Sequence, residues 1–500
     1  MSENLIRGML RAARKAGDMP MIIERGVARL RFSEIDAATA RWANALTGLG
    51  ARVGDRVVVQ VEKSVANVLL YLACLRAGLV YVPLNTAYTA AEVGGFIADA
   101  EPAVVVCDPG KREAIAAVAG RARVATLGAD GMGELGDLAE AAPHGFATVE
   151  RGAGDLAAIL YTSGTTGRSK GAMLSHGALA SNALVLKDYW RWEPGDVLIH
   201  ALPVYHVHGL FVALHGALLN GSTMLWHKAF DADAVIEDFA RASIFMGVPT
   251  FYVRLAAHAG LTREAAAGMR LFVSGSAPLL EATFEAFEAR TGHRILERYG
   301  MTEAGMIASN PYEGERRPGT VGFALPGVEA RVADEEGREL PRGGPGVLEI
   351  KGPNLFSGYW RQPERTAEEM RPDGFFVTGD IATMTADGRI AIVGRAKDLI
   401  IAGGLNIYPR EVELAIDAVE GVGESAVIGV PHPDLGEAAV AVVVRSDPRL
   451  DEAAVLAGIA ERLARFKQPR RVVFVEALPR NAMGKVQKAA LREAYEGLFE

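Results

Sequence analysis

Two patterns of apolar and polar positions alternate along the first half of the chain. Short runs rich in β-branched residues, such as 56–62, are typical of buried strands. Segments with apolar residues at helical spacing follow them. One of these, 64–76, begins at Ser64, a residue type that commonly caps helices. Because strands that alternate with helices form parallel sheets covered by helices, this pattern predicts an α/β fold.

The alternation occupies two stretches of the chain. The second stretch runs from 196 to 273, and a separate apolar run at 156–161 is typical of a buried strand. Two stretches of this kind predict two related parallel-sheet α/β subdomains. Within the first stretch we expect strands at 56–62, 81–83 and 103–107, and helices at 64–76, 90–100 and 111–118.

The pattern changes in the last third of the chain. Between 320 and 393, short apolar runs separated by Gly and Pro, such as 346–351 and 388–393, predict a small β-rich subdomain. The remaining segment is mixed and is long enough to fold alone. Its expected elements are strands at 424–430, 438–444 and 471–475, an amphipathic helix at 451–466 and a terminal helix. We therefore expect a large N-terminal domain (1–394), a hinge (395–398) and a small, mobile α+β C-terminal lid domain (399–500).

Composition narrows the class of protein. Half of the 500 residues are hydrophobic, 23% are charged and the formal net charge is −8, which argues against nucleic acid as a partner. The only two cysteines, Cys74 and Cys107, lie in apolar runs and are expected to be buried free thiols. The first residues lack the apolar core of a signal peptide, and no apolar run reaches 18 residues. We expect a cytoplasmic protein with no membrane partner.

The run from Tyr161 to Lys170, YTSGTTGRSK, carries the strongest chemical signal. Its two glycines allow a ligand to approach the backbone, while its hydroxyls and cations suit the oxygens of a polyphosphate. It is not a Walker loop, because Gly171 follows Lys170 where Ser or Thr would be needed for magnesium. Taken alone, the run also fits a polar surface loop.

Seven further blocks follow in a fixed order, and together they cover roughly residues 20 to 490. They are LPVYHVHG (202–209), SGSAP (274–278), RYGMTE (298–303), FVTGD (376–380), GRAKDLI (394–400), GGLNIYP (403–409) and PRNAMGK (479–485). With these blocks, the chain resembles the acyl-adenylate-forming (ANL) superfamily and, within its acyl-CoA synthetases, most closely the malonyl-CoA synthetases. The resemblance implies that the protein uses ATP and Mg²⁺, with coenzyme A as a co-substrate.

Such an enzyme performs two displacements, and each needs cations and oriented donors. The resemblance implies that Lys485 bridges carboxylate and α-phosphate, Thr302 donates to the α-phosphate, and Glu303 with Thr166 holds Mg²⁺. Tyr299 offers a face for adenine, and Asp380 with Arg395 suits the ribose hydroxyls. The implied ATP-binding residues are Thr162, Ser163, Gly164, Thr165, Thr166, Gly167, Lys170, Ser276, Ala277, Pro278, Tyr299, Gly300, Met301, Thr302, Asp380, Arg395 and Lys485.

The substrate acid is inferred from Arg298. A buried guanidinium favours a carboxylate partner, and malonate supplies one carboxylate to react and one to pair. The alternative is that Arg298 turns to solvent or to Glu297. His206 is expected beside the reacting carboxylate. The implied substrate-contacting residues are Arg298, His206, Ser276 and Met306, and His206, Lys485, Thr302 and Glu303 are the expected catalytic residues.

The function predicted from the sequence is therefore ATP-dependent ligation of malonate to coenzyme A through a malonyl-adenylate. A short-chain, methylmalonate or aryl monocarboxylate–CoA ligase remains the alternative, and a nucleotide-binding regulator without catalysis is disfavoured by the retained site residues. By the same resemblance, the lid is expected to rotate about Lys397, which brings 403–409 to the thiol's access route. A lysine acetyltransferase that modifies Lys485 would remove its charge and inactivate the enzyme.

Overall fold

The computed structural model describes residues 4–162, 169–402, 405–481 and 484–499. Its first sheet has the strand order β6-β5-β3-β4-β7-β8 and is parallel apart from the β7–β8 hairpin. The strands are β3 (Arg56–Gln60), β4 (Val80–Pro83), β5 (Val104–Cys107), β6 (Arg123–Thr126), β7 (Leu156–Thr162) and β8 (Lys170–Ser175). The helices of this region are α1 (Leu5–Ala16), α2 (Ile35–Gly48), α3 (Val65–Arg76), α4 (Ala90–Ala100), α5 (Arg112–Ala116) and α6 (Glu134–Ala141).

The expected elements of this subdomain are confirmed, with changes at their ends. The Ser64 side chain accepts a hydrogen bond from the Asn67 N–H, so it caps α3 as predicted. The helix α3 is buried along almost its whole length. Cys74 and Cys107 are buried free thiols. The helix expected at 111–118 is shorter, because a 3₁₀ turn precedes it and the chain turns again after Ala116. The strand β8 was not expected.

The second sheet has the order β15-β14-β13-β12-β11-β9-β10-β1-β2. Its parallel centre confirms the second predicted α/β subdomain, whereas β13–β14–β15 and β1–β2 are antiparallel. The strands are β1 (Pro20–Glu24), β2 (Val27–Arg31), β9 (Val197–His200), β10 (Thr223–Trp226), β11 (Ile244–Gly247), β12 (Leu271–Ser274), β13 (Leu296–Met301), β14 (Gly305–Ser309) and β15 (Phe323–Ala324). The helices are α7 (His176–Tyr189), α8 (Leu214–Asn220), α9 (Ala232–Asp238), α10 (Pro249–Ala257) and α11 (Glu281–Thr291), with a π-helical turn η3 (His208–Ala213) before α8.

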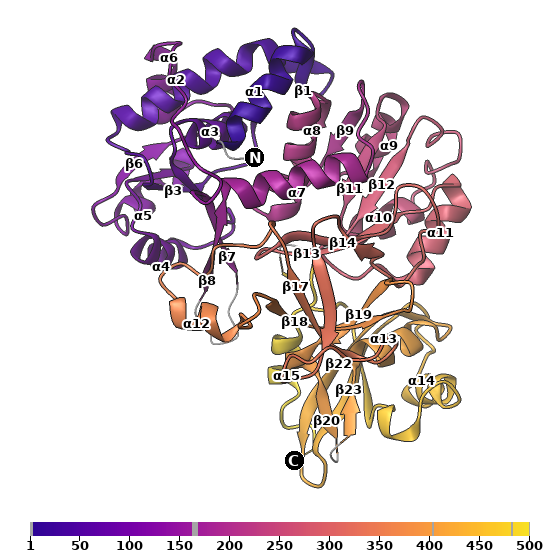
Figure 1. Ribbon diagram of the computed structural model, residues 1–500. Coiled ribbons are helices and arrows are strands. Elements are labelled where there is room, and N and C mark those ends of the chain that lie inside the picture. Colours follow the sequence, from indigo (N-terminus) through magenta and orange to yellow (C-terminus); the bar gives the residue numbers. More distant parts are fainter. Residues whose placement is uncertain (1–3, 163–168, 403–404, 482–483, 500) are drawn as a thin grey trace.

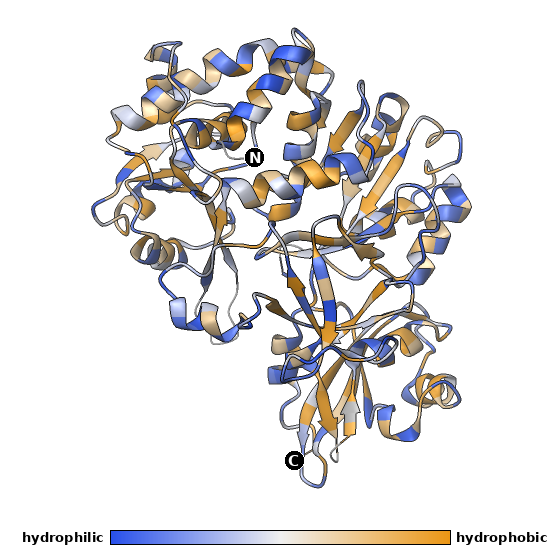
Figure 2. Cartoon of the chain, in the orientation of Figure 1, coloured by the Kyte–Doolittle hydropathy of each residue, from blue (hydrophilic) through white to orange (hydrophobic). Residues whose placement is uncertain are grey.

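The N-terminal strand β1 belongs to this second sheet although the first sheet follows it in sequence. Ile22 pairs with Met224 and Ile23 with Leu225 in the parallel β1–β10 ladder. The helix α7 also joins the two subdomains, since it contacts β8 of the first sheet and β14 and α8 of the second (Figure 1). One hydrophobic core contains residues of both sheets, and the strands are predominantly hydrophobic in Figure 2. The two subdomains are therefore packed into one body.

The small β-rich subdomain is an antiparallel sheet of order β16-β17-β18-β19, as predicted. Its elements are β16 (Glu329–Ala333), β17 (Gly346–Lys351), β18 (Phe376–Met384), β19 (Ile390–Arg395) and the helix α12 (Pro363–Glu368). The last strand begins two residues later than the predicted 388–393, because Gly388 adopts φ 88° and forms the turn.

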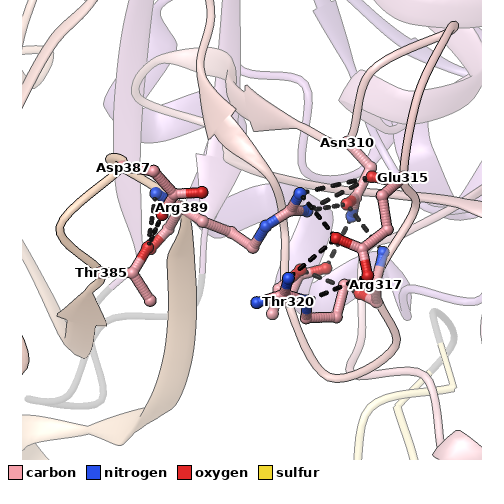
Figure 3. Close-up of polar contacts among 7 residues, drawn as sticks. All are labelled: Asn310, Glu315, Arg317, Thr320, Thr385, Asp387 and Arg389. Carbon is pink, nitrogen blue, oxygen red and sulfur yellow. Dashed lines mark hydrogen bonds and ion pairs between the residues drawn. The ribbon is translucent and has the colours of Figure 1, made fainter.

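A buried arginine anchors this sheet to the second sheet. Arg389, next to the β18–β19 turn, donates to Asn310 Oδ1 at 3.0 Å and lies 3.6 Å from a carboxylate oxygen of Glu315 (Figure 3). Asn310 in turn donates to the carbonyls of Glu297 and Thr320. The network therefore ends on the backbone of β13, one residue before Arg298.

The C-terminal domain forms a sheet of its own with the order β21-β20-β23-β22, and β24 pairs in parallel with β23. Separate hydrophobic clusters cover its two faces. Its elements are β20 (Ile400–Ala402), β21 (Leu405–Ile407), β22 (Val422–His432), β23 (Gly436–Arg445), β24 (Arg471–Val475), α13 (Pro409–Asp417), α14 (Glu452–Ile459) and α15 (Lys488–Ala494). In Figure 1 this domain lies below the β17–β18 sheet. The predicted α+β composition is confirmed.

One element of this domain was predicted wrongly. The helix expected over 451–466 ends at Ile459, and a 3₁₀ turn follows at Arg465–Lys467. The Gln468 side chain donates to the carbonyls of Ala460 and Leu463, which satisfies backbone groups left open where the helix stops. This early end lets the chain turn back so that β24 runs beside β23. No helix in the described part of the chain has both the length and the apolarity needed to cross a bilayer.

Candidate active site

The sequence blocks converge on strands of three sheets. The loop after β12 carries Ser276, β13 carries Arg298 and Tyr299, and the facing strands β18 and β19 carry Asp380 and Arg395. Ligand sites in open α/β sheets commonly form beside the carboxyl ends of strands, as at the end of β12 here. His206 follows β9, Thr162 and Lys170 bracket the β7–β8 turn, and Lys485 comes from the C-terminal domain. Of the implied phosphate-loop residues, Ser163, Gly164, Thr165, Thr166 and Gly167 lie outside the described residues.

Asp380 connects two of the predicted nucleotide ligands. Its buried carboxylate accepts a hydrogen bond from the Tyr299 hydroxyl and lies 2.7 Å from Arg395 Nε. Burial raises the pKa of Asp380, and the Arg395 cation opposes this rise. Arg395 also donates to the Thr378 carbonyl. The three side chains that were assigned separately to adenine and ribose therefore form one connected group.

Glu303 is also buried, and its Oε1 accepts a hydrogen bond from the Tyr359 hydroxyl at 3.0 Å. The same hydroxyl receives a hydrogen bond from Lys170 Nζ at 2.9 Å and lies 2.6 Å from Glu369 Oε2. Lys170 pairs with Glu369 at 3.1 Å as well. Tyr359 thus connects the end of the phosphate loop to the expected metal carboxylate. Tyr359 and Glu369 were not predicted, since neither lies in the blocks that carry the resemblance.

The loop from Ser276 to Pro278 has a constrained backbone. Ser276 adopts φ 75°, a conformation that favours glycine, so its position is set by its surroundings. Its hydroxyl lies 3.3 Å from His208 Nδ1. Ala277 is half-buried and Pro278 is exposed. This loop therefore faces the segment that carries His206 and His208.

Arg298 is buried, with 3% of its surface exposed. Its guanidinium lies against Gly275, where an added Cβ would come within 2.5 Å of Cζ. The structure, over its described residues, gives Arg298 Nε and Nη2 no hydrogen-bond partner, and burial lowers the pKa of the guanidinium to about 9. Arg298 is thus neither turned to solvent nor paired with Glu297, the two alternatives left open by the sequence. Two unpaired donors remain in the interior of the site.

His206 and His208 lie on the same side of the site. Burial, followed by the Lys485 cation, lowers the pKa of His206 to about 4, so its imidazole is neutral at physiological pH. Burial and the nearby Arg298 cation also lower the pKa of His208 well below its usual value. The neutral His206 imidazole has one donor and one acceptor, whereas His208 contacts Ser276 through Nδ1 and has no partner for Nε2 among the described residues.

Lys485 belongs to a tight loop of the C-terminal domain that reaches the N-terminal domain. The Lys485 N–H donates to Asn481 Oδ1, and an added Cβ on Gly484 would lie 3.4 Å from Thr250 in the first turn of α10. Lys485 keeps solvent contact, while surrounding protein and the Arg395 cation lower its pKa. Asp380 and Glu303 lie near enough to oppose that shift. The structure therefore brings Lys485 to the other predicted site residues.

The glycine and methionine residues around Thr302 pack closely against one another. An added Cβ on Gly300 would lie 2.2 Å from the Gly305 carbonyl and 2.6 Å from Met306 Cε, so the β13–β14 turn tolerates no side chain at Gly300. Met301 is half-buried and packs against the main core. A small recess behind Thr302 is mostly apolar, and it is lined by Leu174, Ala178, Leu179, Asn182, Val207, Phe211, Thr302, Gly305 and Asn354.

Lys397, the predicted hinge, is exposed in the 3₁₀ turn Ala396–Asp398 between β19 and β20. Its neighbour Asp398 pairs with Arg492 of α15 at 2.5 Å. Of the segment 403–409, residues 403–404 lie outside the described part of the chain, and β21 presents Leu405 with 48% of its surface exposed. The hinge remains a prediction, placed between the last strand of one sheet and the first of the next.

Two large α/β subdomains share an edge, and a small domain carries a lysine to it. This arrangement defines a class of nucleotide-using enzyme. A family model described as AMP-binding enzyme matches residues 9–360, and one described as AMP-binding enzyme C-terminal domain matches residues 411–485. The chain belongs to the AMP-binding enzyme family. The family predicted from the sequence motifs is thereby confirmed.

Individual relatives give more detail. Feruloyl-CoA synthase of an Amycolatopsis species is 36% identical over 478 residues, which are 95% of each chain. Malonate–CoA ligase of Arabidopsis thaliana is 33% identical over 485 residues and covers 90% of this chain and 79% of the relative. The crystal structure of ATP-bound MatB from Rhodopseudomonas palustris is 55% identical, covers all of both chains and has a TM-score of 0.97. The apo structure of MatB has a TM-score of 0.87, so the arrangement described here is more similar to the ATP-bound form.

Proposed function

We propose that the protein is an AMP-forming malonate–CoA ligase that uses ATP, Mg²⁺ and coenzyme A. The observation that carries the choice of acid is Arg298. A buried guanidinium with two unpaired donors is costly, and a second carboxylate on the substrate would offset that cost. Malonate is a short acid with a carboxylate to spare after the first has reacted. Malonate–CoA ligase from Arabidopsis among the relatives supports the same choice.

In the first displacement, a malonate oxygen attacks the α-phosphorus of ATP, and the bond to pyrophosphate breaks. We propose that Lys485 neutralises the charge that develops between the carboxylate and the α-phosphate, and that Thr302 donates a hydrogen bond to the same phosphate. Mg²⁺, when bound, neutralises phosphate charge, and Glu303 and Thr166 are the proposed residues that hold it. Asp380 and Arg395 hold the ribose, while Tyr299 and the loop Ser276–Pro278 enclose the adenine.

The neutral state of His206 suits its proposed place beside the reacting carboxylate. A neutral imidazole donates one hydrogen bond without a charge that would stabilise the free carboxylate and weaken its attack. Arg298 and Ser276 hold the other end of the acid, and Met306 limits the space beyond it. The substrate is thus oriented at both ends while its reacting oxygen stays available.

In the second displacement, the thiol of coenzyme A attacks the acyl carbonyl of the malonyl-adenylate, and AMP leaves. Lys485 occupies one side of the site in the present arrangement. We propose that the lid then rotates at Lys397 and replaces Lys485 by the segment 403–409. Leu405, on β21 within that segment, exposes 48% of its surface, which is consistent with a side chain that is covered in another arrangement.

An aryl or other monocarboxylate is the second candidate, because feruloyl-CoA synthase is 36% identical to the chain. In that case Arg298 would occupy space that an aromatic tail needs and would stay unpaired. The test measures pyrophosphate release with malonate, methylmalonate, acetate, propionate and 4-coumarate in parallel, each with coenzyme A. We expect kcat/KM to be highest for malonate, with methylmalonate second. A higher value for 4-coumarate or propionate than for malonate would refute the proposed substrate class.

A further inference from the structure

Lys63 is a buried cation outside the predicted site. It lies in the segment between β3 and α3, with 7% of its surface exposed, and its ammonium is 4.3 Å from the centre of the Trp226 ring. It donates to His200 Nδ1 at 3.0 Å, to the His200 carbonyl at 2.8 Å and to the His227 carbonyl at 2.7 Å. These three acceptors match the three protons of an ammonium group. No carboxylate pairs with Lys63 within the described ranges, so its position depends on neutral acceptors alone.

Two contacts favour one tautomer of His200. The Gly209 carbonyl, 3.0 Å from His200 Nε2, can only accept, so Nε2 carries the proton and Nδ1 the lone pair. Lys63 Nζ, which donates to Nδ1, favours the same form, while burial lowers the pKa of Lys63 well below its usual value. Burial and the Lys63 cation lower the pKa of His200 well below its usual value, which keeps the imidazole in this neutral form.

The His200–Gly209 hydrogen bond closes a loop that serves the site. His200 is the last residue of β9 and Gly209 lies in the π-helical turn η3, so the bond joins the two ends of the segment 201–208. That segment carries His206 and His208. The closure is tight, because a Cβ on Gly209 would lie 2.0 Å from the Pro203 carbonyl.

The same segment faces the first sheet. Tyr205, in the middle of the loop, has its pKa raised by burial and also by Glu62, the residue next to Lys63. The segment that carries Lys63 therefore borders the loop 201–208. The Lys63 ammonium also binds His200, the residue that precedes this loop.

We propose that Lys63 is a positioning residue for the substrate pocket. It fixes His200 as the Nε2–H tautomer, and that tautomer clasps the loop 201–208 so that His206 and His208 face the acid. The proposal rests on the proposed function for the identity of the acid, but the clasp itself depends only on the contacts described above. Removing it should weaken binding of the acid and leave the nucleotide contacts on β13 and β18 unchanged.

A pair of variants at His200 separates the clasp from the mere presence of a buried imidazole. In His200→Gln the side-chain amide can take the place of Nε2–H and still reach Gly209, whereas in His200→Asn it is too short to do so. Both variants are neutral amides. We expect His200→Asn to raise the KM for malonate about tenfold, in line with loss of one buried hydrogen bond that has a charged neighbour. His200→Gln is expected to restore most of that loss, with the KM for ATP unchanged within about twofold in both variants.

The link from Lys63 to His200 is tested by Lys63→Met, which keeps the length of the side chain and removes its donors. In protein labelled with nitrogen-15 histidine, the His200 signals, identified by their loss in His200→Gln, should report the Nε2–H tautomer. In Lys63→Met they should shift toward a mixture with the Nδ1–H form, and the KM for malonate should rise as in His200→Asn. This spectrum requires no turnover, so it tests the clasp even if malonate is not the substrate.

Two results would overturn the proposal. One is an unchanged His200 spectrum in Lys63→Met. The other is a rise of the KM values for malonate and ATP by the same factor in His200→Asn and His200→Gln alike, which would show a general loss of structure. Thermal unfolding of each variant, followed by circular dichroism, accompanies the kinetics.

Discussion

Asp380 and Arg395 face each other across the β18–β19 hairpin as register partners, and an ion pair of 2.7 Å joins their side chains. Arg395 is the last residue of β19, and Lys397 follows it by two positions. The proposed ribose contact and the proposed hinge are therefore adjacent in the chain. Arg395 can stay fixed by its strand while the backbone at Lys397 changes conformation.

Lys397→Pro tests this hinge. Proline fixes φ and removes a backbone donor, so it should restrict rotation of the lid. Because the described arrangement already presents Lys485 to the site, we expect malonate-dependent exchange of pyrophosphate into ATP to remain near the wild-type rate. Formation of malonyl-CoA should fall by about a hundredfold or more. Lys397→Ala is the control and should retain both reactions. Normal malonyl-CoA formation by the proline variant would show that no hinge operates there.

Arg298→Gly should abolish most use of malonate. Loss of one partner of a buried charge pair costs about 3–5 kcal/mol, which corresponds to a hundredfold or greater loss in kcat/KM. Binding of ATP, measured by calorimetry without malonate, should be preserved. Arg298→Lys keeps the charge without the planar, bidentate donors and should fall between the wild type and the glycine variant. Normal malonate turnover by Arg298→Gly would refute the dicarboxylate pocket.

Lys485→Ala should separate the two displacements. The cation is needed while pyrophosphate leaves, so adenylate formation is expected to slow by at least about a hundredfold. Thioester formation from preformed malonyl-adenylate should remain largely intact, because the rotated lid would carry Lys485 away. Lys488, which pairs with Glu413 in the same domain, provides the control Lys488→Ala. Equal losses in both half-reactions of Lys485→Ala would contradict the separation.

Acetylation of Lys485 should inactivate the enzyme for the same reason, since it removes the charge. The residue keeps solvent contact. We expect a sample acetylated at Lys485, verified by mass spectrometry, to lose adenylate formation and to regain it after enzymatic deacetylation. Full activity of the acetylated sample would exclude this regulation.

The free energy of unfolding should fall when the pH drops below about 6.5, because several histidines are buried in the neutral form. Burial lowers the pKa of His176 to about 4 and that of His215 to about 3. The unfolded chain binds protons near the ordinary value of 6.5, whereas the folded chain does not until lower pH. Stability present above 6.5 is therefore lost as pH falls toward 4, by about 1.4 kcal/mol per pH unit for each such histidine.

Urea unfolding between about pH 7.5 and 5 measures this slope. His215 also contacts Tyr71 through its Nε2 at 2.8 Å, so His176→Asn is the better variant. Its amide oxygen can still accept the hydrogen bond that His176 Nδ1 receives from the Leu5 N–H. The variant should have a shallower slope than the wild type. A slope that is identical in His176→Asn would contradict this assignment.

Much of the fold follows from local pattern. The strands β3, β5 and β17 and the helices α3 and α4 have strong periodicity and clear start signals, and each was found within a few residues of its expected position. The helix predicted over 451–466 runs past the end of α14, because Leu463 and Phe466 continue the apolar spacing beyond Gly458 and Ile459, where the helix ends. There the stop comes from the Gln468 side chain, a contact that periodicity does not show.

Long-range pairing explains one further omission. The place of β1 in the second sheet depends on its pairing with the distant β10. In the site, residues such as Asp380 and Arg298 could be predicted because they lie in recognisable sequence blocks. Tyr359 and Lys63 were not, since their roles depend on which distant side chains the fold brings to them.

The pairing of β1 with β10 also has a consequence for how the chain is made. Ile22 is synthesised before the first sheet, but its partner Met224 is synthesised only after the whole of that sheet. The first sheet can thus assemble during synthesis, while β1, paired with β2 alone, still lacks its partner β10. Non-local contacts of this kind close late and slow folding. The β1–β2 pair is therefore among the last parts to reach its place, and a nascent chain stalled before residue 224 would display it to chaperones.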